Sequence, residues 1–523
     1  MLKDAESQSA GKTQMLLVLL CVSVPSFMIN LDSNIVAVSL PSIAQSLHAD
    51  FSAIEWVISA YTLTFASLLM PAGALADRYG RKRMLLIGLS IFTLASLCCG
   101  AATSAPILNA ARAIQGIGAA IQLSSALATL SHSFRGKARA KAFAFWGSVI
   151  GVAIALGPVA GGFITHFFGW EWAFYVNIPV GASMLALTTY TIEESKDPDA
   201  RKIDILGFVT FSASLFLLTL CLISGNQYGW HSSRILSELT CAIVLFGVFV
   251  TVEKRQARPM LDLAFFRKPT YIGANIAGVT YAATLLSMLT FIPVFLQSGL
   301  RYSPQQAGLL MLPIAIPLIV MPRIVGSYLA YRFSGRALLT AGLFLVSLGL
   351  AWIASQISAA SYPALLGGML VAGCGAGILN GEIAKVGMAV IPPERAGMAS
   401  GVSGTARFSG IVVGFSGLGA VLFAGVAKTI REGHTSMTTA AQNNMIRNIA
   451  AGNLRGMTNQ GNTTDIHALA FHSFQNGYQT MILFAAVLAF SASIACWILV
   501  RYNETRPSSR EMPVQNTTPV PAD

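Results

Sequence analysis

The segment between the second and third apolar runs of the chain reads Gly73-Ala74-Leu75-Ala76-Asp77-Arg78-Tyr79-Gly80-Arg81-Lys82-Arg83. The runs on either side, 54–76 and 84–102, are long enough to cross a membrane as helices. The chain must turn between them within a few residues. Gly80 permits that turn, and Gly73 permits close approach of two helices. The segment predicts a tight basic connection, with Asp77 near its basic neighbours or facing a helix N-terminus of another part of the protein.

The rest of the sequence has the composition of a membrane protein. Of its 523 residues, 54% are hydrophobic and only 11% are charged, whereas soluble proteins carry about 25% charged residues. This composition excludes a conventional soluble enzyme and a disordered chain. The net charge of +12 fits basic cytoplasmic loops, and no basic polar domain is present that would bind nucleic acid.

Fourteen apolar runs are long enough to be membrane helices. They lie at 15–38, 54–76, 84–102, 107–130, 141–165, 173–192, 205–224, 236–252, 270–297, 305–328, 336–356, 363–388, 400–427 and 477–500. Most lysines and arginines fall in the connections that a cytoplasmic N-terminus places inside the cell. The sequence therefore predicts an all-α polytopic protein of the inner (cytoplasmic) membrane, with both termini in the cytoplasm.

Six motifs occur in an order that is typical of one transporter family. The 73–83 segment resembles the signature loop of the major facilitator superfamily. Two sets of residues resemble its fourth-span motif and the fifth-span motif of its antiporters: Leu108, Arg112, Gln115, Gly116, Gly118, Ala119 and Ala120, and Gly151, Gly157, Pro158, Gly161 and Gly162. Residues 31–41, 170–179 and 397–410 are similar to motifs of the fourteen-span drug:proton antiporter branch.

Three positions depart from that branch. Asn34 stands where the branch usually has Thr, and Glu171 stands where it usually has Arg. In the second copy of the signature loop, Tyr331 occupies the place of the Asp. The resemblance therefore supports the export mechanism and leaves the substrate open.

The resemblance implies a major facilitator fold of two six-helix bundles plus two extra spans, 14 transmembrane helices in all. The expected division is a cytoplasmic N-terminus (1–14), an N-terminal bundle (15–192), a cytoplasmic linker (193–204), two additional helices (205–252), a C-terminal bundle (253–500) and a cytoplasmic tail (501–523). Residues 428–476, rich in Asn, Thr and Gly, are expected to form an outer loop in which 436–450 is a short surface helix.

Two acids, Asp32 and Glu382, lie well inside predicted spans, where an ionisable group is costly and marks a functional candidate. Asp32 lies roughly 26 Å along the first span and Arg112 roughly 8 Å from the outer start of the fourth, so both belong to the outer half. They are expected to form a proton-coupling site, the role that the family gives to an acid of the first span. A static pair that orders the bundle is the alternative.

The second acid has a different setting. Glu382 lies towards the inner side of the twelfth span, with Lys385 one helical turn further and Arg407 at comparable depth. These three residues are expected to form a charge cluster. It would serve as an inner gate or structural pair, or alternatively as a second proton site.

Glycine, proline and polar residues of the spans suggest moving parts and a cavity. Gly157-Pro158 should bend the fifth span, and Gly161 should let it pack closely, so that it seals the outer side; a kink without a gating role is the alternative. Arg407 and the 73–83 segment are the other expected conformational elements. The expected cavity residues are Asn34, Tyr61, Gln115, Gln122, Trp146, Tyr281 and Asn380.

The sequence thus predicts a proton-coupled antiporter that exports drugs or other mostly lipophilic small molecules; a dedicated exporter of one metabolite or peptide is the alternative. No catalytic constellation, metal-ligand spacing or nucleotide-binding loop is present, so neither an enzyme nor a cofactor is expected, and the proton gradient is the energy source. The expected partners are the substrate, protons and the lipid bilayer. A periplasmic adaptor is added if the cell is Gram-negative, and the protein is otherwise a monomer.

Overall fold

The computed structural model describes residues 2–134, 136–196, 205–256, 263–391, 396–433, 438–452, 454 and 463–506. Within these ranges every regular element is a helix. Parts of the expected linker (197–204) and of the expected tail (507–523) lie outside the described residues.

The described chain forms a series of helices, which are named here in sequence order. The first part contains α1 (Leu2–Ser46), α2 (Phe51–Tyr79), α3 (Arg81–Gly100), α4 (Ala105–Ser133), α5 (Gly136–Phe168), α6 (Trp172–Tyr175) and α7 (Asn177–Thr191), followed by α8 (Ile205–Tyr228) and α9 (Ser233–Arg255). The second part contains η1 (Leu263–Arg267), α10 (Pro269–Tyr281), η2 (Ala282–Leu286), α11 (Ser287–Val294), η3 (Phe295–Gly299), α12 (Pro304–Leu310), α13 (Leu312–Ile324), η4 (Val325–Leu329), α14 (Ala330–Arg332), α15 (Gly335–Gln356), η5 (Ile357–Ala359), α16 (Tyr362–Ala389), α17 (Ala396–Gly433), α18 (Thr439–Ala450), α19 (Thr463–Leu499) and η7 (Tyr502–Glu504).

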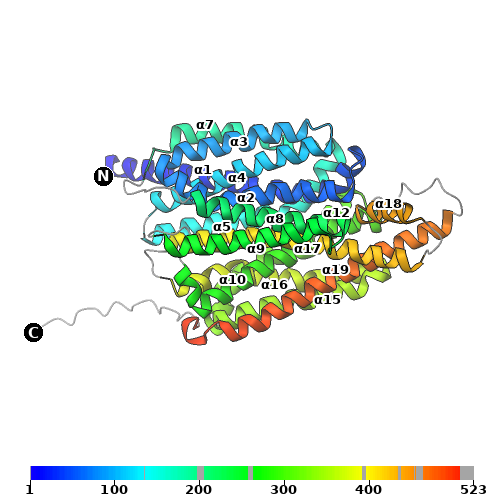
Figure 1. Cartoon of the computed structure of the whole chain (residues 1–523). Coiled ribbons are helices and arrows are strands. Elements are labelled where there is room, and N and C mark those ends of the chain that lie inside the picture. Colours follow the sequence, from blue (N-terminus) through cyan, green and yellow to red (C-terminus); the bar gives the residue numbers. More distant parts are fainter. Residues whose placement is uncertain are drawn as a thin grey trace, which may run out of the picture.

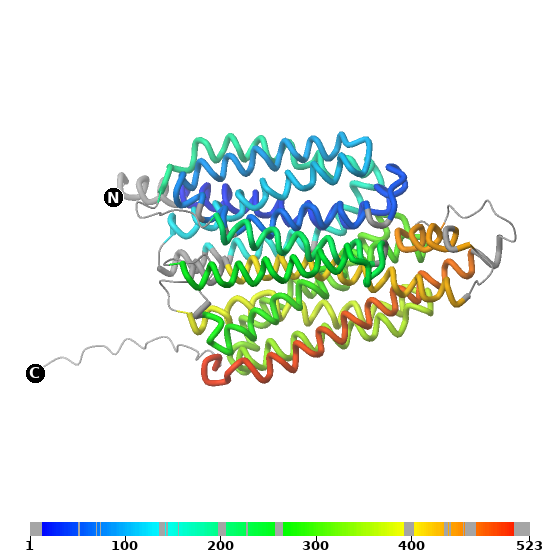
Figure 2. The backbone as a smooth tube through the Cα atoms, in the orientation of Figure 1, coloured from blue at the N-terminus to red at the C-terminus, as the bar shows by residue number. Residues whose placement is uncertain are grey.

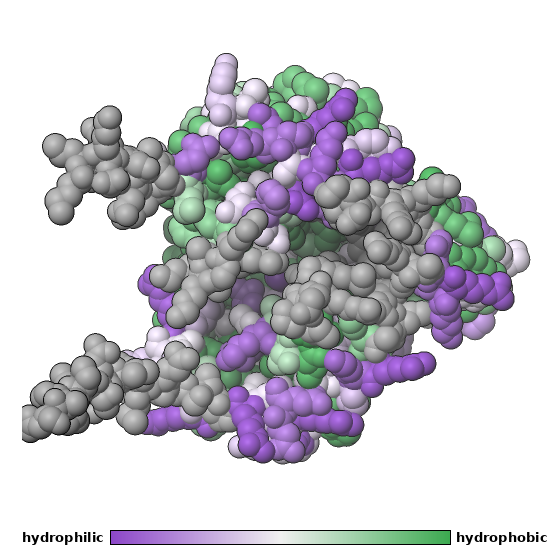
Figure 3. Space-filling model, turned by 90° about the vertical axis from the view of Figure 1, so that its left-hand side faces the viewer, coloured by the Kyte–Doolittle hydropathy of each residue, from purple (hydrophilic) through white to green (hydrophobic). Residues whose placement is uncertain are grey.

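The long helices run side by side in two groups (Figures 1 and 2). Helices α1–α7 form one group, and α10–α17 with α19 form the other. Helix α8 packs against α2 of the first group and α17 of the second, and α9 packs on α8. We call the end of the molecule with the 80–81 turn the Gly80 end, and the opposite end, where α18 lies, the α18 end (Figure 1). In Figure 3, which looks onto the Gly80 end, hydrophilic side chains gather over both halves.

The number of spans agrees only in part with the sequence. Among the described residues, 11 helices are long and apolar enough to cross a membrane, or 13 if two strongly bent pairs are each one span. The bent pairs are α2, which turns by 53° next to Pro71, and α5, which turns by 43° four residues before Pro158. The remaining predicted span, 173–192, consists of α6 and α7. Since α7 has 15 residues, it is shorter than the about 20 that a full crossing needs, and a count of 14 is not confirmed.

The two halves use equivalent contacts at the Gly80 end. The Glu194 carboxylate, just after α7, accepts hydrogen bonds from the backbone N–H groups of Lys82 and Arg83, each 3.1 Å long, and so caps α3. In the second half, the Thr505 backbone oxygen accepts from the Gly335 N–H at 2.8 Å, and its hydroxyl accepts from the Arg336 N–H at 3.2 Å. The segment that follows the last long helix of each half therefore caps the third long helix of that half.

The 73–83 segment agrees with the sequence at Gly80 and Asp77 and differs at Gly73. Gly80 has φ +112° and makes the turn between α2 and α3. Asp77 pairs with its basic neighbour Arg81 at 2.8 Å, the first of its two expected settings. The expectation of close helix packing at Gly73 is wrong here, because a Cβ on that residue would meet nothing within 4 Å among the described residues.

The expected outer loop 428–476 is shorter than predicted. Helix α17 continues to Gly433 and α19 begins at Thr463, so helix replaces both ends of that loop. The short helix expected at 436–450 is confirmed as α18, which the Thr438 hydroxyl caps. It is not only a surface helix, since Ile446 and Ile449 are fully buried in the core.

The two halves interlock at the α18 end through glycine contacts. A Cβ on Gly162 of α5 would lie 2.4 Å from the Pro304 backbone oxygen of α12, and a Cβ on Gly308 would lie 2.3 Å from that of Pro158. Towards the Gly80 end, by contrast, Gly326 has open space. The closest packing between the halves among these glycines is therefore at the α18 end.

Replacement of Gly80 by alanine should destabilise the protein for two reasons. The positive φ costs about 1–3 kcal/mol in a residue with a side chain, and the new Cβ would displace the Glu194 carboxylate from 2.5 Å away. Gly229→Ala is the matched control, because Gly229 also has a positive φ (+87°) but open space around it. We expect a larger drop in the apparent unfolding temperature for Gly80→Ala in scans of fixed rate. Equal drops in unfolding temperature for the two variants would show that the Glu194 cap does not stabilise the protein.

Replacement of Gly308 by leucine should push the halves apart at the α18 end. The Ser59 and Ser416 hydroxyl oxygens of α2 and α17 lie 3.4 Å apart, so cysteines at these positions should form a disulfide in a background without native cysteines. Overpacking of about 1–3 kcal/mol shifts the equilibrium between the closed and open states about 5- to 150-fold towards opening, and the cross-linking rate should fall accordingly. Gly326→Leu, in the same span, is the control that should leave the rate unchanged. Equal rates for the two variants would contradict the proposed contact.

Candidate functional site

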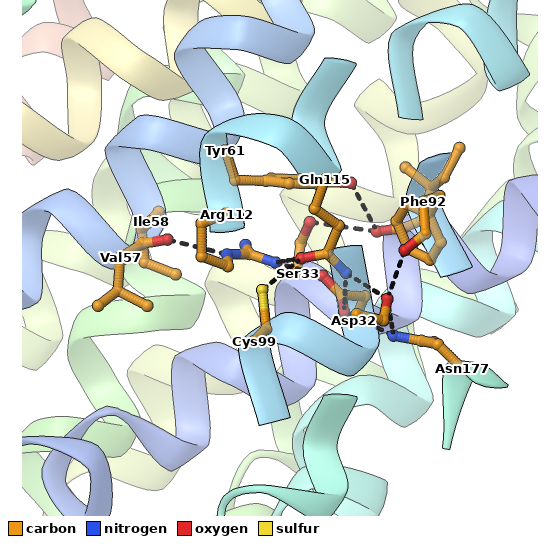
Figure 4. A network of polar contacts seen from close by, with 12 residues as sticks. Asp32, Ser33, Val57, Ile58, Tyr61, Phe92, Cys99, Arg112, Gln115 and Asn177 are labelled. Atoms are coloured by element: carbon orange, nitrogen blue, oxygen red, sulfur yellow. Dashed lines mark hydrogen bonds and ion pairs between the residues drawn. The ribbon is translucent and has the colours of Figure 1, made fainter. Parts of the chain in front are cut away.

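The most strongly built polar site is an ion pair between α1 and α4 (Figure 4). Nη1 of Arg112 lies 2.6 Å from Oδ2 of Asp32, and neither side chain has any exposed surface. The sequence placed both residues at the same depth, and the structure brings them into contact. Because charges removed from water are costly unless they are paired and hydrogen-bonded, the surroundings of this pair decide whether it is stable.

Further side chains of α4 and α7 complete the carboxylate's shell. Oδ1 of Asp32 accepts hydrogen bonds from the side-chain amides of Gln115, at 3.0 Å, and Asn177 of α7, at 2.8 Å. The Gln115 amide also donates to the Ser96 hydroxyl of α3 at 2.8 Å. Among the described residues, each hydrogen-bond partner of the Asp32 carboxylate is a donor, which is the environment of an ionised carboxylate. We call Asp32, Ser96, Arg112, Gln115 and Asn177 the carboxylate network.

The Arg112 guanidinium is held from several sides. Its Nε donates to the Val57 backbone oxygen of α2 at 3.0 Å, and Nη1 also donates to Oε1 of Gln115 at 2.7 Å. The ring of Tyr61 lies 4.1 Å from the guanidinium carbon, a cation–π contact. Nη2 alone is buried without a hydrogen-bond partner.

Several predicted cavity residues are buried in the protein instead. Tyr61, Gln115, Gln122 and Tyr281 are each at most 2% exposed. Gln122 donates to the Pro25 backbone oxygen at 2.8 Å. The expectation that these four side chains line an open cavity is wrong for this conformation, because all four are enclosed by neighbouring helices.

The three remaining predicted cavity residues are partly exposed. The Trp146 indole N–H donates to the Ser26 hydroxyl at 2.9 Å. A Cβ on Gly151 of α5 would lie 3.6 Å from the side-chain nitrogen of Asn380 on α16, so these residues face each other across the two halves. Asn34 donates to the Asn30 backbone oxygen of its own helix at 2.7 Å.

The structure assembles only part of the expected charge cluster of the second half. Glu382 is 4% exposed and pairs with Lys385 at 3.2 Å. Arg407 does not pair with Glu382, and its guanidinium lies 5.7 Å from the ring centre of Tyr281. Oε2 of Glu382 and Nε of Arg407 are both buried without hydrogen-bond partners. The prediction of one cluster of three charges is therefore wrong here.

The residues of the antiporter motif in α5 pack against two different parts of the protein, α1 and the other half. A Cβ on Gly157 would lie 2.2 Å from the Asn34 Cβ of α1, and one on Gly161 would lie 2.9 Å from the Ile35 Cα. Pro158, by contrast, contacts α12 of the other half through its backbone oxygen. The motif thus fixes α5 closely to α1 and presents an adjacent residue to the opposite half.

Two polar residues of the described structure were missed by the sequence reasoning. Asn177 lay within the quoted 170–179 motif, but nothing in the sequence connected it with Asp32. Glu55 lies at the edge of the predicted span 54–76, where no sequence signal marks it; it is 3% exposed. No group of three or more His, Cys, Asp or Glu side chains suited to a metal ion occurs among the described residues.

Comparison with curated proteins finds relatives over most of the chain. The multidrug resistance protein Stp of Mycobacterium tuberculosis is 37% identical over 80% of this chain and 78% of its own. The methylenomycin A resistance protein of Streptomyces coelicolor is 33% identical over 76% and 83% of the two chains. The drug efflux pump JefA of Mycobacterium tuberculosis is 32% identical over 78% and 80%.

Solved structures share the fold at low sequence identity. A bacterial homologue of the human lysosomal transporter Spinster, in an inward-facing unoccupied conformation, has a TM-score of 0.62 and 17% identity, covering 91% of this chain and 96% of its own. A D-xylose–proton symporter has a TM-score of 0.60 and 14% identity, covering 95% and 100%. The family model described as Major Facilitator Superfamily matches residues 22–415. The chain, a multi-pass membrane protein and a transporter rather than an enzyme, belongs to the major facilitator superfamily.

Proposed function

We propose that this protein is a proton-coupled antiporter that exports mostly lipophilic small molecules from the cytoplasm by alternating access. The carboxylate network carries the proposal, because it holds one acid inside a transporter with three side-chain donors from two helices, α4 and α7. The names of the relatives, which refer to drug efflux and antibiotic resistance, support export as the direction. The protein works as a monomer in the cytoplasmic membrane, with both termini inside the cell.

The position of the close contacts between the two halves indicates which state of the transport cycle this conformation represents. With the basic connections in the cytoplasm, the Gly80 end faces inward and the α18 end outward. The halves interlock at the α18 end, so this conformation is closed to the outside. The donors around Asp32 suit the ionised carboxylate that remains after a proton has left towards the cytoplasm.

The next steps follow from the same contacts. Protonation of Asp32 in the outward-facing state removes its attraction to Arg112 and weakens the links between α1, α4 and α7. The substrate leaves in that state, and the protonated carrier returns inward. The membrane potential contributes about 2.3 kcal/mol per net charge and 100 mV to each cycle.

The partly exposed residues of the expected cavity support one class of substrate. Asn34, Trp146 and Asn380 are the partly exposed polar groups of the expected cavity, and the spans that carry them are mostly apolar in sequence. Such a surface suits lipophilic molecules with few polar groups. A dedicated exporter of one compound is the second candidate, favoured by the relative that is named for methylenomycin A alone.

Asp32→Asn should uncouple transport from protons. The amide keeps a hydrogen-bond acceptor for Arg112 but cannot take up and release a proton in this pH range. We expect substrate-dependent proton movement in membrane vesicles to be lost, while substrate binding and membrane insertion are retained. Glu238→Gln, which removes a carboxylate paired with Arg234 on α9, is the control. Undiminished proton movement in Asp32→Asn would remove this residue from the coupling mechanism.

Asn177→Ala should shift the pH profile of transport. Loss of one donor to Oδ1 removes a charge-assisted hydrogen bond worth about 1.5–3 kcal/mol, so proton release to the cytoplasm should require a higher internal pH. Transport rates should be measured over a range of internal pH. Asn109→Ala is the matched control, because Asn109 lies on α4 and donates to the Ala53 backbone oxygen without contacting Asp32. An unshifted Asn177→Ala profile would mean that this contact is only structural.

A further inference from the structure

A small pocket lies between the two halves at the α18 end. Its walls come from both halves and from α18, and its interior has room for about one water molecule. The residues that matter here are Leu40 and Glu55 of the first half, Phe291, Phe415 and Tyr478 of the second, and Ala451 beside α18. Apart from Glu55, Thr290 and Tyr478, the lining is apolar.

Two polar atoms at this pocket have no hydrogen-bond partner among the described residues. Glu55 is 3% exposed, and its Oε1 has no hydrogen-bond partner; the Tyr478 hydroxyl, on a fully buried residue, has none either. No ion pair with Glu55 is present among the described residues. A buried, unpaired polar group is costly and requires an explanation.

The charges around Glu55 do not favour its ionised form. On its own helix, the nearest acting charge is Asp50, the N-cap of α2, which is also acidic. The elements packed against it contribute Tyr478 as their only titratable lining group, and no cation. Closure of the pocket is therefore compatible with a protonated Glu55 and opposes an ionised one.

We propose that Glu55 is a proton-binding site of the outer gate. The halves close at the α18 end over the neutral carboxyl, and opening of that end exposes the group to water and lets its proton leave. Because the proton returns to the side from which it came, it sets the pH at which the gate closes and is not transported. The inference deepens the proposed function and rests on its alternating access, but Glu55 acts separately from the Asp32 proton.

The test measures gate opening directly, without substrate or gradient. Spin labels are attached to Ser46→Cys of the first half and Ser358→Cys of the second, both exposed at the α18 end, in a protein without native cysteines. Distances are measured by double electron–electron resonance in lipid nanodiscs from about pH 5 to about pH 9. As pH rises, the otherwise unchanged protein should shift from a short to a longer distance. Glu55→Gln, which imitates the protonated form, should keep the short distance at every pH.

Two controls separate this proposal from the proposed function. Glu238→Gln should shift with pH like the parent, because Glu238 lies away from the pocket and has its own ion pair. Asp32→Asn should also keep the shift, although it loses proton-coupled transport. If Glu55→Gln shows the parent's full pH shift, the Glu55 proposal is overturned while the coupling role of Asp32 stands. If Asp32→Asn retains coupled transport, the proposed coupling site fails while the distance measurement still decides on Glu55.

Discussion

The buried ion pair between Asp32 and Arg112 is the interaction on which the first half of the molecule depends. Two charges without exposed surface are stable only if their remaining hydrogen-bonding capacity is met. Gln115 and Asn177 meet that need, and they connect α1, α4 and α7 through one carboxylate. A change in one proton therefore changes contacts between several helices at once, which is what coupling of a proton to a conformational change requires.

Close packing of α5 connects such a change at Asp32 with the other half of the molecule. Gly157 and Gly161 fix α5 against α1, the helix that carries Asp32, while Pro158 contacts Gly308 of the other half. Packed helices transmit small shifts because their interfaces have few voids to absorb them. A rearrangement at Asp32 is therefore adjacent to the contact that closes the α18 end.

Three buried acids differ in how far the structure satisfies them. Asp32 has three side-chain donors, Glu382 has one lysine and an oxygen without a partner, and Oε1 of Glu55 has no partner among the described residues. This order follows their proposed roles: a carboxylate that is ionised in this conformation, a local pair, and a carboxyl that is neutral when the gate is closed. The three proposed roles thus differ in the hydrogen-bond donors and charges that surround each carboxyl group.

The sequence by itself determined the membrane class, most of the spans, the family and the shared depth of Asp32 and Arg112. These features depend on local apolar runs, on motifs of neighbouring residues and on the fixed rise of a helix. Only the tertiary structure decided that Asn177 joins the network, that Gly73 lies in open space and that Glu55 faces a pocket between the halves. Such contacts join segments far apart in the chain, and they depend on the rotation and packing of many helices, which no local pattern specifies.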